Sequence, residues 1–137
     1  MTLHIFNPSH DEALGFGSPY YVPTKAAQQL ATLRCTLPAL WADVGDAILI
    51  TDDCRRPQLD DGLLYVYKRE LTPTFLQRVT KISPWGWNAY LRHTLRRCGV
   101  DDALLPSDED LAHLRTLSSR ETAVKLLHKL LNHNPKW

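Results

Sequence analysis

The chain has 137 residues, of which 44% are hydrophobic and 23% charged, and its formal net charge is +1 at pH 7. This length fits one compact domain with a real core, and the near-neutral, mixed charge favours neither disorder nor nucleic-acid binding. The sequence contains neither an apolar run of roughly 18 residues nor the basic-then-apolar start of a signal peptide, so we expect a cytoplasmic protein that does not bind membranes.

Short apolar runs predict the strands. Residues 3–6, 47–50 and 63–67 are rich in aliphatic or aromatic side chains and are bounded by Asp, Gly or Pro, and a weaker fourth strand is expected at 78–82. Continuous apolarity is typical of strands that are covered on both faces. The sequence therefore predicts an α/β fold with a Rossmann-like parallel sheet of about four strands flanked by helices, and a helical C-terminal extension.

A crossover helix is predicted at 24–34, between the first two predicted strands, because good helix formers there place apolar residues at helical spacing. A short helix at 37–41, opened by Pro38, and a turn at Gly45-Asp46 follow. The order strand, helix, strand implies a right-handed βαβ unit.

Two further helix starts are predicted from a capping residue followed by proline. Thr72-Pro73 carries this signal, and Ser83-Pro84 repeats it ahead of a helix from about 85 to 98 that ends at Gly99. Both positions are therefore expected to begin helices.

The last third of the chain is predicted to be helical. One helix begins at Ser107 with acidic residues in its first turn, and Ser118 with Glu121 matches a capping box ahead of the last helix. We expect a Rossmann-like domain at 1–105 and a helical extension at 106–137, whose end, 132–137, shows no periodicity and is expected to fray.

The cysteines and histidines do not favour a metal centre. Cys35, Cys54 and Cys98 are far apart without C-x-x-C spacing, and no H-E-x-x-H pattern occurs. We expect reduced, structural thiols and no metal site.

The loop after the first strand is the first candidate site. Roughly 17 residues separate that strand from the crossover helix, whereas such connections are usually about 2 to 6 residues long, and long loops are commonly functional. The loop is expected at the carboxyl edge of the sheet, where open parallel sheets bind ligands. Asn7 is expected to cap a short helix that starts at Pro8 and ends before Gly15, which would leave the N–H groups of Ser9 and His10 free for an anion.

The same loop does not match a nucleotide-binding motif. Gly15 and Gly17 begin a G-x-G-x-x-G pattern, but Tyr20 replaces the third glycine, and a P-loop motif is absent from the sequence. The glycines are more typical of a helix end and a turn.

Two interpretations of the polar loop residues stay open. Asn7 and His10 are expected either to hydrogen-bond loop backbone or to contact a ligand together with Asp11. Because adjacent residues on a helix do not face each other, His10 and Asp11 are not expected to form an acid–base dyad.

The stretch "SPWGWNAY" is the second candidate site. Trp85 and Trp87 are expected to pack in the core or an interface, since this is the usual role of such residues. Alternatively, both indoles line a pocket whose polar end is Asn88 or an open helix N-terminus.

Several motifs together resemble one protein family. The stretches "HIFNPSHDEAL", "PTKAAQQL", "LPALWA", "SPWGWN" and "LPSDEDLAHLRTLSSRETAVKLL" are similar to the N-terminal region of a bacterial family, common in Bacteroides-type bacteria, that looks like ATP-grasp proteins. The resemblance covers nearly the whole chain, from Leu3 to about Leu131. It implies a Rossmann-like pre-ATP-grasp domain ahead of an ATP-binding ligase portion.

The resemblance implies a role on the substrate side of a carboxylate–amine ligase. ATP-grasp enzymes activate a carboxylate as an acyl phosphate, and Arg120 matches the basic position that approaches their ATP-binding portion. The sequence after Leu131 contains no counterpart of the glycine-rich lid, the lysines or the acidic metal ligands of that portion. We therefore expect no catalysis by this chain alone, an unidentified small-molecule substrate, and ATP and magnesium only with a longer protein.

A different class of function stays open beside this one. The chain is alternatively expected to be a non-enzymatic interaction domain or a small-ligand sensor. An interaction domain would pair, including with copies of itself, through its Trp-rich surface or through uncovered helices.

Overall fold

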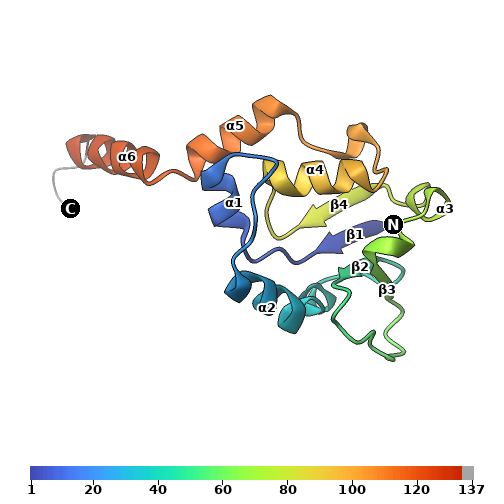
Figure 1. Ribbon diagram of the computed structural model, residues 1–137. Coiled ribbons are helices and arrows are strands. Elements are labelled where there is room, and N and C mark those ends of the chain that lie inside the picture. Colours follow the sequence, from blue (N-terminus) through green and yellow to red (C-terminus); the bar gives the residue numbers. More distant parts are fainter. Residues whose placement is uncertain (134–137) are drawn as a thin grey trace.

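The computed structural model describes residues 1–133, which form an α/β fold with a parallel sheet flanked by helices (Figure 1). The sheet has four strands in the order β3-β2-β1-β4, and every neighbouring pair is parallel. The predicted fold class is confirmed. The strands are β1 (Thr2–Ile5), β2 (Ala47–Ile50), β3 (Leu64–Tyr67) and β4 (Lys81–Pro84).

The helices lie on both faces of the sheet and beyond its carboxyl edge (Figure 1). The crossover helix predicted at 24–34 is confirmed as α2, and the structure adds its cap, since the Thr24 hydroxyl accepts the Ala27 N–H at 3.3 Å. The helices are α1 (His10–Phe16), α2 (Lys25–Arg34), α3 (Pro73–Leu76), α4 (Ala89–Arg97), α5 (Asp108–Leu117) and α6 (Arg120–His133), with 3-10 turns η1 (Leu37–Leu40), η2 (Lys68–Glu70) and η3 (Asp102–Leu104).

Each face of the sheet has its own apolar cluster. On one face, Leu3 of β1 packs in a cluster with Leu91 and Leu95 of α4. On the other face, Ile48 of β2 belongs to a cluster with Cys35, which follows α2. Burial on both faces explains why the strands are nearly continuous apolar runs.

The prediction that Ser83-Pro84 begins a helix is wrong, because both residues lie in β4, and the strand expected at 78–82 is shifted toward the C-terminus. The N–H of Trp85 donates to the Ile5 carbonyl at 2.7 Å, and Ile5 pairs with Pro84. In a parallel pair of strands, the backbone nitrogens of successive residues point alternately toward and away from the neighbouring strand. The nitrogen of Trp85 points toward β1, so the ring nitrogen of Pro84 points to the open side of β4. A proline there removes no sheet hydrogen bond.

The expected cap and end of the first short helix are also wrong. Helix α1 begins at His10, and the side chain of Asn7 binds elsewhere, although its carbonyl accepts the His10 N–H at 3.0 Å. Gly15 lies within the helix, and Gly17 ends it with a φ of 68°, a left-handed conformation that glycine adopts without strain. The His10 N–H, which was expected to be free for an anion, is therefore occupied by the Asn7 carbonyl.

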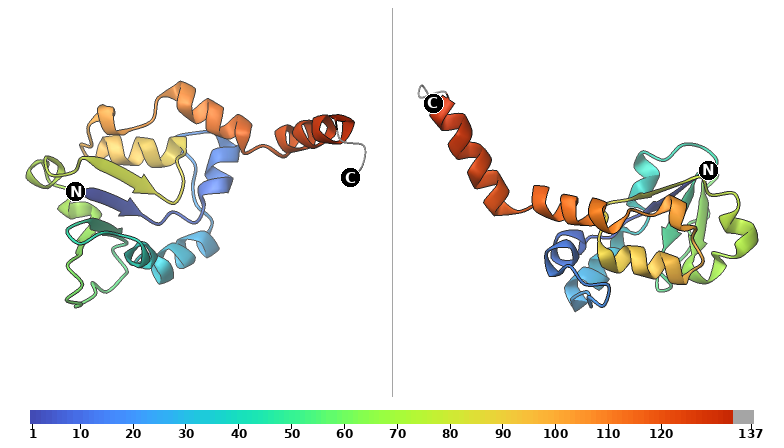
Figure 2. Two further views of the ribbon diagram at one scale, coloured as in Figure 1. Left: turned by 180° about the vertical axis from the view of Figure 1, so that it is seen from behind. Right: turned by 90° about the horizontal axis from the view of Figure 1, so that it is seen from above.

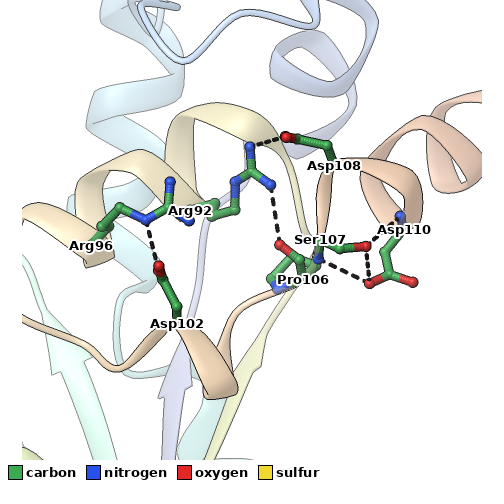
Figure 3. A network of polar contacts seen from close by, with 7 residues as sticks. All are labelled: Arg92, Arg96, Asp102, Pro106, Ser107, Asp108 and Asp110. Atoms are coloured by element: carbon green, nitrogen blue, oxygen red, sulfur yellow. Dashed lines mark hydrogen bonds and ion pairs between the residues drawn. The ribbon is translucent and has the colours of Figure 1, made fainter.

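Helix α5 is fastened to the body of the domain through α4 (Figure 3). The Arg92 guanidinium donates to the Pro106 carbonyl at 3.2 Å and pairs with Asp108, which lowers the pKa of that carboxyl. At the start of α5 the Ser107 hydroxyl accepts the Asp110 N–H at 3.1 Å, while the Asp110 carboxylate accepts the Ser107 N–H at 2.9 Å. This reciprocal pair is a capping box.

Helix α6 projects away from the body, as both views of Figure 2 show. The prediction that Ser118 and Glu121 form a capping box is wrong by one residue, because the Ser119 hydroxyl accepts the Thr122 N–H at 3.1 Å. Glu121 instead pairs with Lys125 at 2.6 Å. The end of the tail predicted to fray, 134–137, lies outside the described residues.

Candidate functional site

The strand order places a topological switch point of the sheet between β1 and β4. The chain passes from β1 to β2 on one side of β1, while β4 lies on its other side. Open parallel sheets bind ligands at such switch points, beyond the carboxyl ends of the two strands. The loops that follow β1 and β4 both start at this switch point.

The two loops are joined by the side chain of Asn7. Its Nδ2 donates to the Gly86 carbonyl at 2.7 Å, and its Oδ1 accepts the Gly86 N–H at 3.2 Å. One carboxamide therefore satisfies both polar groups of a partly buried glycine. This pair of bonds fixes the loop after β1 against the loop after β4.

The imidazole of His10 packs directly on Gly86. A Cβ atom at position 86 would lie 2.3 Å from the ring, so only glycine allows this contact. Within residues 1–133, the Nδ1 atom of His10 is buried without a hydrogen-bond partner. Its Nε2 atom lies 3.6 Å from the carboxylate of Asp11, which is longer than a hydrogen bond, and the Asp11 side chain is 96% exposed.

A groove of about 450 Å³ lies beside these residues, along β4 and the loop that follows it. His10 of α1 lines one side, and Leu114 and Ser118 at the C-terminal end of α5 line another. Both Trp85 and Trp87 contribute to the wall. The structure thus brings His10 and the two indoles, predicted from separate stretches of the sequence, to one groove.

The two tryptophans differ in their surroundings. Trp87 is partly buried and packs against the apolar cluster beneath α4. Trp85 is 57% exposed, although its ring contacts Phe6 at 5.5 Å and Trp41 at 6.2 Å between ring centroids. Sequence reasoning assigned no role to Trp41, because its contact with Trp85 joins segments that are distant in the chain.

Four predicted site residues do not line the groove, namely Asn7 and Asp11, described above, and Asn88 and Arg120. Asn88 is 2% exposed, and its Oδ1 accepts the Leu91 N–H at 2.8 Å, which caps α4. Its amide therefore organises the helix that follows the loop. Arg120 is exposed at the start of α6, the helix that projects from the body.

A buried polar pair that sequence reasoning missed lies at the amino end of the sheet. The Asp46 carboxylate accepts the Thr2 N–H at 2.7 Å and lies 3.1 Å from His4 Nε2. The Thr2 N–H and the His4 side chain lower the pKa of Asp46. A histidine inside an apolar strand was the available signal, since burial requires such a ring to find a polar partner.

The described part of the chain, residues 1–133, brings together no group of three His, Cys, Asp or Glu side chains that could hold a metal ion. It also contains no helix with the length and apolarity needed to cross a membrane.

No family model, curated protein or solved structure matches this chain.

Proposed function

We propose that this chain is the N-terminal, substrate-side domain of an ATP-grasp carboxylate–amine ligase and is not catalytic alone. The observation that carries the proposal is the pair of hydrogen bonds between Asn7 and Gly86, called the Asn7–Gly86 brace below. These bonds hold His10 and Trp85 at a groove beside the switch point of the sheet. Such a braced loop is expected of a binding site, since its geometry is set before a ligand arrives.

The proposed roles differ among the predicted residues. His10, Trp85 and Trp87 contact the small-molecule substrate, and Asn7 acts as a positioning residue through Gly86. Asp11 is exposed in the first turn of α1, where it can reach a partner domain or the solvent-facing end of a ligand.

The proposal assigns ATP and magnesium to a separate ATP-binding portion, toward which Arg120 and α6 extend. The resemblance of the sequence motifs supports this division, and the α/β fold of the chain is consistent with it. ATP would there supply the phosphoryl group that activates a carboxylate.

Two measurements test the proposal. Titration of the chain with Mg–ATP, followed by backbone NMR, is expected to show no saturable binding, and saturable tight binding would contradict the proposed division.

In the protein encoded by the entire reading frame, His10→Ala is expected to lower ADP release in the presence of carboxylate and amine substrates without loss of folded structure. Glu109→Ala, an exposed change on α5, serves as the matched control. The proposal fails if no ATP-binding portion is encoded or if His10→Ala leaves the kinetics unchanged.

One observation favours the alternative of a non-enzymatic interaction domain. Trp41 and Trp85 contact each other while remaining 49% and 57% exposed, and half-exposed tryptophans are enriched at protein interfaces. Light scattering over a range of concentrations tests self-association. A monomer at every concentration contradicts pairing between copies, and association that Trp85→Ser abolishes supports it.

A further inference from the structure

The groove along β4 has an aromatic wall that remains accessible. Trp85 is 57% exposed; its ring contacts Trp41 at an interplanar angle of 44° and meets the Phe6 ring at 76°. This edge-to-face contact holds the indole in place without covering it entirely. A flat conjugated ring gains more than a saturated one from contact with such a surface, because both π systems can stack.

The polar side of the groove offers a hydrogen-bond donor at His10. A proton on Nδ1 would leave a buried N–H without an acceptor, since Nδ1 lies against Gly86 and has no partner within residues 1–133. Buried N–H groups without an acceptor are rarer than buried acceptors without a donor. Of the two neutral tautomers, the one with its proton on Nε2 is therefore favoured, and the ligand atom that meets Nε2 must be an acceptor.

The other polar lining of the groove agrees with such a ligand. Lys81 at one end is a donor, and the hydroxyls of Ser83 and Ser118 can donate as well. The volume of about 450 Å³ accommodates a small ring system.

We propose that the groove binds a planar conjugated heterocycle, of the nucleobase or nicotinamide kind, which stacks on Trp85 and presents an in-plane carbonyl oxygen or ring nitrogen to His10 Nε2. This inference rests on the proposed function for the choice of the groove, and it adds the chemical class of the substrate.

The test uses uracil, hypoxanthine and nicotinamide as probes of the intact chain. Dihydrouracil is the matched ligand control, because it keeps both carbonyls of uracil but lacks the conjugated ring. Binding is followed by ¹H–¹⁵N NMR through the indole N–H signals of Trp85 and Trp87 and the amide of Gly86. At least one planar probe is expected to bind in the millimolar range, and uracil more tightly than dihydrouracil.

Three variants locate the binding. Trp85→Leu is expected to weaken binding by about fivefold to a hundredfold, and His10→Phe, which keeps a ring against Gly86 but lacks a donor, by about fivefold. Tyr20→Leu removes a ring that is 77% exposed elsewhere and is expected to bind like the unaltered chain. Thermal unfolding of each variant shows whether it is folded, and His10→Phe gives an independent readout if Trp85→Leu does not fold.

The inference is overturned if no planar probe binds, if uracil and dihydrouracil bind equally, or if folded Trp85→Leu and His10→Phe retain full affinity. Failure of this inference can be told apart from failure of the proposed function by the response to ATP. Saturable binding of ATP with its adenine in this groove would contradict the ligase division while supporting a ring-binding site.

Discussion

Asn7 and Gly86 are 79 positions apart in the sequence, yet one side chain makes both hydrogen bonds to the glycine backbone. Asn7 follows β1 and Gly86 follows β4, so this contact links the two strands that flank the switch point. The brace makes the position of His10 depend on a residue in a different loop.

Asn7→Asp is expected to destabilise the protein by about 1–3 kcal/mol, because a carboxylate would face the Gly86 carbonyl in place of the donor that now pairs with it. Urea denaturation measures the change. Gln28→Glu is the control, because the Gln28 amide also donates to a backbone carbonyl but is exposed, and its effect should stay within about 0.5 kcal/mol. Equal effects of the two changes would contradict a special role for Asn7.

Gly86→Ala is expected to cost about 1–3 kcal/mol, because the new methyl group would overlap the His10 ring. The NMR signals of the His10 imidazole should shift as the ring is displaced. Gly15→Ala provides the opposite control, since nothing lies within 4 Å of a Cβ built there and the residue is inside α1. That change should stabilise the protein by about 0.5–1 kcal/mol. A Gly86→Ala variant as stable as the unaltered chain would show that His10 does not need this glycine.

Asp46→Asn is expected to lower the free energy of unfolding at neutral pH by about 1–3 kcal/mol. It is also expected to remove part of the loss of stability that acid causes. The pKa of Asp46 is lowered in the folded state, chiefly by the Thr2 N–H and also by His4, so the unfolded chain binds the proton more tightly. The contribution of this carboxylate is therefore present above about pH 4, its ordinary range, and is lost as the pH falls toward the lowered value.

Urea denaturation of both proteins as a function of pH tests this expectation. The stability difference between the unaltered chain and Asp46→Asn should shrink below about pH 4, whereas the exposed change Asp53→Asn should show no such trend. A difference that stays constant down to acid pH would mean that the Asp46 charge does not stabilise the fold.

Cys35 is expected to resist alkylation while the protein is folded. Burial and the neighbouring Cys54 thiol raise the pKa of Cys35 to about 11, so the reactive thiolate is scarce at neutral pH, and the residue is 2% exposed. Mass spectrometry after brief iodoacetamide treatment should find the partly exposed Cys98 modified well before Cys35. In urea all three cysteines should react alike. Rapid modification of Cys35 in the folded protein would contradict its burial.

Local patterns by themselves determined the strands and the crossover helix. The apolar runs at β1, β2 and β3 and the helix-forming run of α2 were predictable because burial on both faces and helix propensity act through residues that are close in the chain. The same local rules misplaced the helix at Ser83-Pro84, since the signal of serine followed by proline does not reveal that Pro84 turns its nitrogen to an open sheet edge.

Tertiary structure alone decided how the candidate site is built. The sequence by itself indicated Asn7, His10 and Trp85 as residues of interest, but not that Asn7 binds Gly86 or that His10 lies against it. The contacts of Asp46 with His4 and of Trp41 with Trp85 were equally hidden. Each of these contacts joins residues that are more than 40 positions apart, so it exists only once the parallel sheet aligns their strands, and no short sequence pattern encodes it.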